Sequence, residues 1–281
     1  MQHFILTLRC QDGPGIIHAV AGALLTVGAN VLDQAQFTDE ETGLFALRTR
    51  FEAPDQDPDA IAEAVRGNAA AFDPIVEVRP ENRHRRALVM VSKFDHCLVD
   101  LLYRHELGEL PIDIPLIVSN HEDCRAIAER HGIPFIVIPV TAETKSGAEA
   151  QLMGLINEHD IDVVVLARYM QVLSDEFCAR LPGRIINIHH SFLPGFKGAR
   201  PYHQAHARGV KLIGATAHFV TADLDEGPII EQEVERVTHA ATADDLAEIG
   251  RDVERMVLSR AVRLFAEDRI VLNDRRTIVF G

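Results

Sequence analysis

The chain has 281 residues, 47% of them hydrophobic and 25% charged, which is ordinary for a globular protein with a substantial core. Its formal net charge of −14 argues against binding to nucleic acid or to an anionic membrane, because both need a basic surface. No apolar run approaches the ~20 residues that cross a bilayer, and the amino terminus lacks the pattern of a signal peptide. We therefore expect a cytoplasmic protein, with its four widely spaced cysteines reduced and no metal site among them.

The first 80 residues predict a small antiparallel domain. Apolar alternation favours strands, and helical periodicity after a glycine- and proline-containing turn favours helices. The expected strands cover residues 4–10, 30–38, 44–51 and 75–78, and the expected helices cover residues 16–27 and 59–71. The order is βαββαβ, which predicts a ferredoxin-like unit.

A polar, basic stretch at residues 81–86 predicts a linker, and residues 87–281 predict a second domain of different type. Short, continuous apolar strands that alternate with helices are typical of an α/β, Rossmann-like parallel sheet covered on both faces. The expected strands cover residues 87–91, 114–118, 135–138, 163–166, 185–189, 214–220 and 229–237. Helices are expected from about residues 97 and 124, and over residues 148–158 and 243–265.

Polar side chains stand at the carboxyl end of the predicted strand 185–189, where ligands of open parallel sheets bind. Asn187 and His189 are two residues apart, so they project to the same face of the strand. An amide and an imidazole side by side can both donate hydrogen bonds to an oxyanion that grows on an attacked carbonyl. The alternative interpretation is a turn-forming amide beside a packed imidazole.

Asp225 lies in a tight loop that ends with Gly227 and Pro228. A carboxylate held in such a loop can orient a water molecule or an imidazolium, although it can also be a simple turn former. Ser191 has no GxSxG elbow around it, so we do not expect a serine nucleophile. Asn187, His189 and Asp225 together predict carbonyl addition without a covalent enzyme intermediate.

Several cationic or ionisable side chains surround this segment, namely Lys197, Arg200, His203 and His206. They could form a solvated face, but in an acidic protein a local cationic group suits an anionic ligand. Lys197, Arg200 and the strand residue His218 are therefore candidate contacts to a substrate or an anion.

Three ordered segments, residues 187–194, 198–202 and 218–228, resemble the folate-dependent formyltransferase superfamily. The resemblance implies that Asn187, His189 and Asp225 are a catalytic trio and that 10-formyltetrahydrofolate is the substrate, with no tightly bound cofactor and no metal. It also implies a formyltransferase-like catalytic domain. The implied folate-binding stretch consists of Arg168, Tyr169, Met170, Gln171, Val172 and Leu173.

The amino-terminal unit resembles an ACT domain, a regulatory and oligomerisation module. In many ACT domains the loop matching Asp12, Gly13, Pro14 and Gly15 helps to bind a small amino acid at a dimer interface; the same residues could simply initiate a helix. The resemblance implies an amino-acid effector and a homodimer or homotetramer, with no nucleic-acid or membrane partner.

An ACT-like unit before a formyltransferase-like unit resembles the hydrolytic branch of the superfamily, which releases formate and tetrahydrofolate, supplies formate for purine biosynthesis and balances one-carbon pools. Glycinamide ribonucleotide formyltransferases hold a phosphate in a glycine-rich loop after their first strand. Here residues 92–98 contain no glycine, and Phe94 is large enough to fill the acceptor space, which favours water as the acceptor. Lys197 stands where an apolar residue is expected, which leaves its role open.

Two alternatives remain to be weighed against a hydrolase. A methionyl-tRNA formyltransferase is disfavoured because the chain has neither the extra RNA-binding domain nor a basic charge. An amino-acid sensor with a degenerate catalytic half is a second possibility, against which the intact Asn187, His189 and Asp225 argue.

Overall fold

The computed structural model describes residues 1–195 and 201–281, which form two compact units. The first unit contains residues Met1–His84 together with Asp268–Asn273 and Thr277–Gly281. The second unit contains Arg85–Glu267 together with Asp274–Arg276. Each unit has its own core and is described separately.

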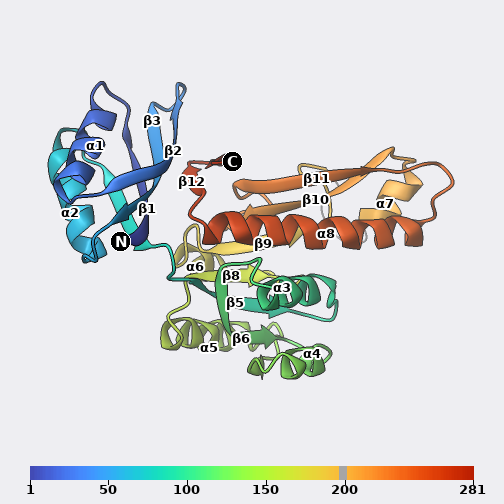
Figure 1. The fold of residues 1–281 in the computed structure, drawn as a ribbon. Helices are drawn as coiled ribbons and strands as arrows, with labels where there is room; N and C mark the ends of the chain where they lie inside the picture. Colours follow the sequence, from blue (N-terminus) through green and yellow to red (C-terminus); the bar gives the residue numbers. More distant parts are fainter. Residues whose placement is uncertain (196–200) are drawn as a thin grey trace. The chain divides into compact units, whose positions relative to one another are not determined.

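The first unit is an antiparallel sheet covered by two helices (Figure 1). Its sheet order is β2-β3-β1-β4, which agrees with the βαββαβ order expected from the sequence. Apolar side chains of β1 and β3 pack against those of the helices, with Phe4, Phe51 and Ile61 fully buried. The elements are β1 (Gln2–Gln11), α1 (Ile16–Thr26), β2 (Asn30–Asp39), β3 (Leu44–Ala53), α2 (Pro58–Asn68), a 3-10 turn (Ala70–Phe72) and β4 (Ile75–Pro80).

The end of the described chain returns to this first unit, which the sequence did not lead us to expect. Strands β12 (Ile270–Asn273) and β13 (Arg276–Val279) form a two-stranded sheet, and Val271 and Phe280 pack against Ala46. The guanidinium of Arg79 on β4 donates to the carboxylate of Asp268, with Nε at 2.8 Å. Both side chains of this ion pair are about nine-tenths buried, at 11% and 10% exposure.

The second unit is a seven-stranded sheet of order β11-β10-β9-β8-β5-β6-β7. Strands β5 to β9 are mutually parallel. From β5 the chain adds β6 and β7 on one side and then β8 and β9 on the other, so the strand order reverses between β5 and β8. The strands are β5 (Arg85–Val91), β6 (Ile112–Ser119), β7 (Phe135–Val137), β8 (Val163–Leu166), β9 (Ile185–His189), β10 (Leu212–Phe219) and β11 (Ile229–Arg236). The carboxyl ends of β5 and β8 therefore form a topological switch point, where open α/β sheets bind their ligands.

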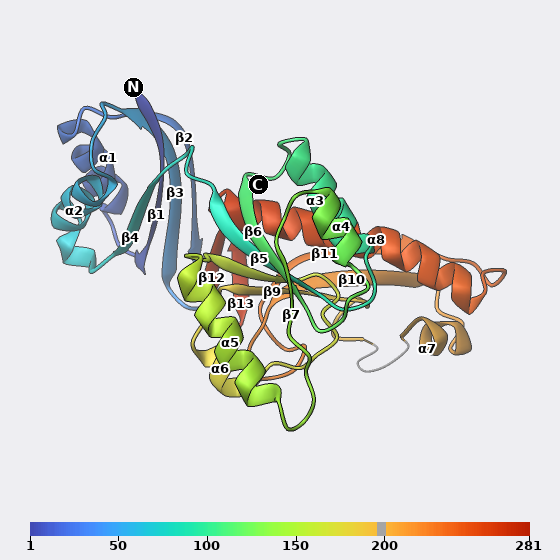
Figure 2. The same cartoon turned by 90° about the horizontal axis from the view of Figure 1, so that it is seen from below.

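Helices cover both faces of this sheet (Figure 2). Helices α5 and α6 pack on one face against Met90, Leu166 and Ile185, while α3 and α8 pack together on the other. The helices are α3 (His96–Glu106), α4 (Arg125–Arg130), α5 (Lys145–Glu158), α6 (Asp175–Ala179), α7 (Pro201–Ala207) and α8 (Ala243–Ala266). Helix α8 begins with a capping box in which Thr242 and Asp245 satisfy each other's backbone N–H groups.

The expected all-parallel sheet is corrected at one edge, because β10 and β11 run antiparallel to their neighbours. The connection of β10 to β11 is a short loop rather than a crossover helix, and only antiparallel strands can be joined in that way. The expected linker is also shorter than residues 81–86, since Arg85 and Arg86 already pair with β6. The short helices α6 and α7 and the hairpin β12–β13 were not predicted.

All four cysteines, Cys10, Cys97, Cys124 and Cys178, are free and buried. None of the helices in residues 1–195 and 201–281 is long and apolar enough to cross a bilayer.

The Arg79–Asp268 pair predicts a large effect of Asp268→Asn on stability. Asp268 has φ 53°, a left-handed conformation that Asn also tolerates, so the substitution removes the charge with little backbone strain. Leaving Arg79 buried without its counter-charge should lower the free energy of unfolding by roughly 3 kcal/mol. Urea unfolding followed by circular dichroism measures the change. Asp274→Asn is the matched control, because Asp274 has φ 52° but is exposed; equal effects of the two substitutions would contradict the assignment.

Candidate active site

The face of β9 that packs toward α5 and α6 turns polar at its carboxyl end. Ile185 is buried in the core of that face, and Asn187 and His189 follow it at alternate positions. The pairing of Leu166 with Asn187 on neighbouring parallel strands places both side chains on this same face. Strand alternation therefore brings Asn187 and His189 together, as the sequence predicts.

The neighbouring strand β10 adds His218 directly beside Asn187, with which it pairs. The ring of His218 is 2% exposed, and its Nδ1 lies 2.9 Å from the carbonyl oxygen of Phe219. A carbonyl oxygen only accepts, so Nδ1 carries the proton and Nε2 carries a lone pair. The side-chain amide of Asn187 donates to that Nε2 at 3.3 Å. His218, expected as a substrate contact, is thus placed behind Asn187 and fixes its orientation.

Asp225 reaches the same group from the loop between β10 and β11. Its Oδ1 lies 3.3 Å from Nδ1 of His189 and 3.7 Å from Nε2 of His218. The loop is held tightly: Phe219 donates its N–H to the carbonyl of Pro228, and a Cβ on Gly227 would meet the carbonyl oxygen of Phe219 at 1.7 Å. Asp225 itself has φ 57°, in the left-handed region that Asp tolerates in turns.

The electrostatics of the group favour an ionised Asp225 carboxylate and neutral rings at His218 and His190. Burial would raise the pKa of Asp225, but the hydrogen bond and charge of His189, with smaller contributions from His218 and His190, hold that pKa below its usual value. Burial lowers the pKa of His218, against the hydrogen bond to Phe219, and keeps this ring neutral. Burial and the nearby charge of Arg168 also lower the pKa of His190, to about 4.

The remaining ring nitrogen of His189 has no partner among the described residues. Its Nε2 is buried and makes no hydrogen bond, while Nδ1 faces Asp225. When Nδ1–H donates to the ionised carboxylate, Nε2 carries the lone pair and can take a proton from water. Asn187 offers a second amide N–H beside it. This arrangement can deprotonate a nucleophile and stabilise an oxyanion at one carbonyl.

Other sequence-predicted residues lie elsewhere. The hydroxyl of Ser191 donates to the carbonyl of Gly195 at 2.7 Å, so it is held by the backbone and is not activated. The ring of His190 stacks on His189 with centroids 5.1 Å apart, because β9 ends at His189 and strand alternation stops there. Lys197 and Arg200 lie outside the described residues. His203 and His206 are exposed on α7.

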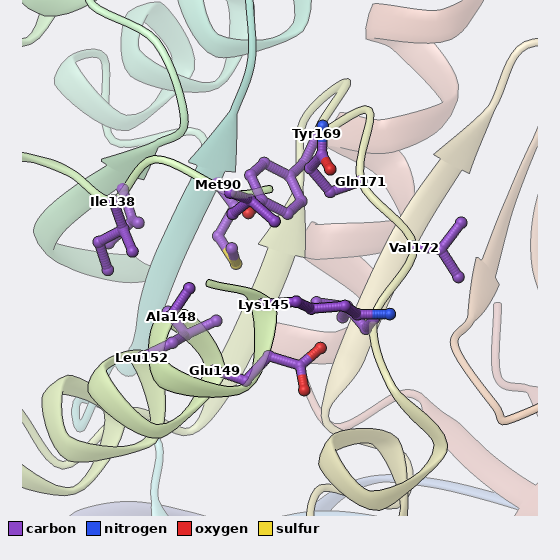
Figure 3. Close-up of a pocket in the computed structure, with 12 residues that line it drawn as sticks. Met90, Ile138, Lys145, Ala148, Glu149, Leu152, Tyr169, Gln171 and Val172 are labelled. Atoms are coloured by element: carbon purple, nitrogen blue, oxygen red, sulfur yellow. The ribbon is translucent and has the colours of Figure 1, made fainter. Parts of the chain in front are cut away.

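The expected folate-binding stretch follows β8 and lines a cavity on the α5 face of the sheet. Four of its residues, Tyr169, Gln171, Val172 and Leu173, contribute to the wall, and the cavity holds about 330 Å³ of empty space that is partly open to solvent. Figure 3 shows Lys145 and Glu149 of α5 reaching toward this stretch, with the ring of Tyr169 above Met90. Met170 and Val172 are more than half exposed, at 52% and 58%. The cavity combines apolar walls with one cation and one carboxylate.

A buried serine fixes this stretch to the end of β5. The hydroxyl of Ser92 accepts the N–H of Met170 at 2.9 Å and donates to Oδ1 of Asn120 at 2.7 Å. Ser92 is 2% exposed and Asn120 is 9% exposed. Three strand ends are tied together at the switch point in this way. A lone serine after an apolar strand carries no distinctive signal, so sequence reasoning did not identify it.

A second buried group surrounds Glu254 of α8, which is 1% exposed. His96 lies 2.9 Å from its Oε2, Tyr202 donates to its Oε1 at 2.5 Å, and Nε of Arg168 lies 3.3 Å from Oε2. Burial would raise the pKa of Glu254, but the bond from His96 and the charge of Arg168 outweigh it and lower that pKa. A charged residue within the apolar stripe of a helix was the available signal for this group.

His96, Cys97 and Glu254 are the one set of side chains among residues 1–195 and 201–281 that stands close enough to hold a metal ion. Their chemistry fits a metal poorly. Burial, with the charge of Glu254, raises the pKa of the Cys97 thiol well above its usual value, so the sulfur stays protonated. Arg168 already supplies a positive charge to Glu254.

Comparison with known proteins identifies relatives along the whole chain. The formyl transferase family model matches residues 85–262. A formyltetrahydrofolate deformylase from Corynebacterium sp. (strain P-1) is 48% identical over 98% of this chain and 97% of that protein. A crystal structure of a formyltetrahydrofolate deformylase from Burkholderia mallei superposes with a TM-score of 0.96 and 50% identity, covering 100% of both chains.

A more distant relative covers a smaller share of the chain. The crystal structure of glycinamide ribonucleotide transformylase 1 from Symbiobacterium toebii gives a TM-score of 0.67 and 32% identity over 70% of this chain and 94% of that chain. The transformylase thus shares the formyltransferase fold but matches a smaller share of the chain. The resemblance seen in residues 187–228 is confirmed, and the chain belongs to the formyl transferase family and, within it, to the formyltetrahydrofolate deformylases.

Proposed function

We propose that the protein hydrolyses 10-formyltetrahydrofolate to formate and tetrahydrofolate, with Asn187, His189 and Asp225 as its catalytic residues. The observation that carries the proposal is that Nε2 of His189 has no hydrogen bond while its Nδ1 faces Asp225, on the strand where His218 orients the Asn187 amide. The full-length similarity to formyltetrahydrofolate deformylases supports the choice of substrate and reaction.

The first step is the addition of water to the formyl carbon. Nε2 of His189 takes a proton from the water as the oxygen bonds to carbon. The imidazolium that forms is stabilised by the Asp225 carboxylate, 3.3 Å from its Nδ1. The formyl oxygen becomes an oxyanion and accepts the free N–H of Asn187, whose other N–H is bound to His218.

The second step breaks the bond between the formyl carbon and N10. The imidazolium returns its proton to N10, and the electron pair of that bond leaves with the nitrogen. Formic acid then ionises to formate. One histidine thus acts first as base and then as acid.

The cavity beside Tyr169 and Val172 is the site that we assign to the folate. Exposed apolar side chains and the polar Lys145 and Glu149 suit a flat aromatic ring with hydrogen-bonding edges. Lys197 and Arg200, which lie outside the described residues, remain candidates for the anionic tail of the substrate.

The amino-terminal unit is proposed to be an ACT-like regulatory domain, with residues 1–80 before the catalytic domain. Gly15 ends the Asp12–Gly15 turn with φ 102°, a conformation that favours glycine and starts α1. An amino-acid effector bound by this turn is consistent with that shape. Strand β2 lies at a sheet edge with exposed Val31, Leu32 and Phe37, which supports a homodimer or homotetramer.

Formyl transfer to another acceptor, and amino-acid sensing without catalysis, are the alternatives. The connection from β5 to α3 has no glycine to bring backbone N–H groups around a phosphate, which disfavours a nucleotide acceptor. The ordered hydrogen bonds around Asn187 and Asp225 disfavour a degenerate site. Formate production is then proposed to supply purine biosynthesis and to balance one-carbon pools.

Incubation with 10-formyltetrahydrofolate alone tests the reaction. Formate and tetrahydrofolate should appear in equal amounts without any added acceptor. Asn187→Ala, His189→Ala and Asp225→Ala should each lower kcat by roughly 100-fold or more, because groups that act in the transition state are lost. Ser191→Ala should retain activity, since its hydroxyl is bound to Gly195. Near-wild-type turnover of any of the three folded variants would refute the assignment.

Acidification should destabilise the fold through the buried imidazoles. The folded-state pKa of His190 is lowered to about 4, so its contribution to stability is complete above the unfolded pKa near 6.5 and is lost as the pH falls toward 4. His218 acts in the same direction. Each proton that the unfolded chain binds and the folded protein does not lowers the free energy of unfolding by up to ~1.4 kcal/mol per unit of decreasing pH.

The measurement is urea unfolding at several pH values between 7 and 4. In His190→Gln the free energy of unfolding should fall less steeply with decreasing pH, by the contribution of about one proton. Substitution of the exposed His206 should leave this slope unchanged. An identical slope in the wild type and His190→Gln would show that His190 is not held neutral.

Ser92→Ala should weaken folate binding more than it slows chemistry. The variant removes the hydroxyl that holds the N–H of Met170, so the folate-binding stretch loses its attachment to β5. We expect KM for 10-formyltetrahydrofolate to rise roughly 10-fold while kcat falls less, because one buried hydrogen bond contributes about 1–1.5 kcal/mol. Ser92→Thr, which keeps the hydroxyl, should restore part of the loss. A fall in kcat alone would contradict this positioning role.

A further inference from the structure

The side of the switch point that faces α8 carries a hub of polar side chains. The Glu254 carboxylate lies within 3.3 Å of Tyr202, His96 and Arg168, which come from α7, the start of α3 and the loop after β8. Glu254 thereby joins the carboxyl ends of β5 and β8 to α8. This is where a second substrate would enter a doubly wound sheet.

The guanidinium of Arg168 is buried within this hub. Its Nε and Nη1 each expose less than 1 Å²; Nε is ion-paired with Oε2 of Glu254 at 3.3 Å, and Nη1 makes no hydrogen bond to any described residue. The ring of Phe94 covers the guanidinium at 5.5 Å. The buried Nη1 without a hydrogen bond is costly, and Arg168 also has φ 64°, which is strained for a residue with a Cβ. A fold that tolerates both costs retains this side chain for its volume and charge.

Helix α8 is shaped to hold the hub. Gly250 lies one turn before Glu254, and a Cβ on Gly250 would meet the ring and hydroxyl of Tyr202 at 2.1 Å. Glycine inside a helix costs about 1 kcal/mol relative to alanine. The missing Cβ is what lets Tyr202 reach Oε1 of Glu254.

Two consecutive residues, Arg168 and Tyr169, lie toward opposite faces of the sheet. Tyr169 lines the cavity on the α5 face, whereas Arg168 contacts Glu254 of α8. The folate-binding stretch therefore has one residue toward each face of the sheet. His189 and His190 stand at the boundary, with stacked rings.

We propose that Arg168, positioned by Glu254 and Tyr202, is a specificity-determining residue that closes the acceptor side of the active centre to every nucleophile larger than water. The inference rests on the proposed hydrolysis. An amine that gained access would form a bond from its nitrogen to the formyl carbon, the bond to N10 would break, and the amine proton would pass to N10. The products would be a formamide and tetrahydrofolate.

The test is the double variant Arg168→Gly with Glu254→Gln, assayed with 10-formyltetrahydrofolate and the small primary amine glycinamide. Glycine accepts φ 64° without strain, and glutamine leaves no buried unpaired charge. Wild type should give formate only. The variant should raise the ratio of N-formylglycinamide to formate by on the order of 10-fold or more. A change of one group in a binding pocket alters the discrimination between two substrates by about that factor. Both products arise from one folate complex, so weaker folate binding does not change the ratio.

Two further variants make the result decisive. Gly250→Ala should displace Tyr202 and raise the same ratio without touching Arg168, and Arg168→Lys should raise it where the double variant does not fold. Arg251→Ala, an exposed residue of α8, is the control and should leave it unchanged. Folded variants that hydrolyse the substrate with an unchanged ratio would overturn the inference. Absence of formate from the wild type would instead overturn the proposed hydrolysis.

Discussion

The hydrogen bond between Nδ1 of His218 and the carbonyl of Phe219 determines how the side chains around Asn187 are arranged. It fixes the tautomer of a buried ring, so Nε2 accepts and the amide of Asn187 must donate to it. The neutral His218 then leaves the Asp225 carboxylate to His189. Since His218 is almost wholly buried, no water can substitute for any of these contacts. One backbone carbonyl therefore sets the direction of three side chains.

The two buried carboxylates of these groups each have specific counterparts. Asp225 faces His189, and Glu254 faces Arg168 and His96. The Asp225 carboxylate lies beside the rings of His189 and His218, and the Glu254 carboxylate lies among Arg168, His96 and Tyr202. A low-dielectric surrounding strengthens such pairs and also makes any unpaired partner expensive.

The sequence predicted that Asn187, His189 and Asp225 lie together, because a local rule governed the geometry of each. Strand alternation placed Asn187 and His189 on one face. The loop ending in Gly227 and Pro228 indicated that the Asp225 carboxylate could be held in position to orient a water molecule or an imidazolium. The antiparallel direction of β10 and β11 was not predictable in the same way, because an apolar run looks alike in either direction. The hub around Glu254 depends on side chains from four distant segments, and no local pattern encodes their meeting. Ser92 acts through a backbone N–H, which leaves no trace in residue type.

The return of β12 and β13 to the first unit links two ends of the chain: Arg79 and Asp268 are 189 residues apart yet form one buried ion pair. In sequence terms the second unit is an insertion within the first. During synthesis on the ribosome the amino-terminal sheet can form early, but Ala46 and Arg79 must wait for the last strands before their surfaces are covered. The first unit can therefore be completed only after residues 85–267 of the second unit have been synthesised.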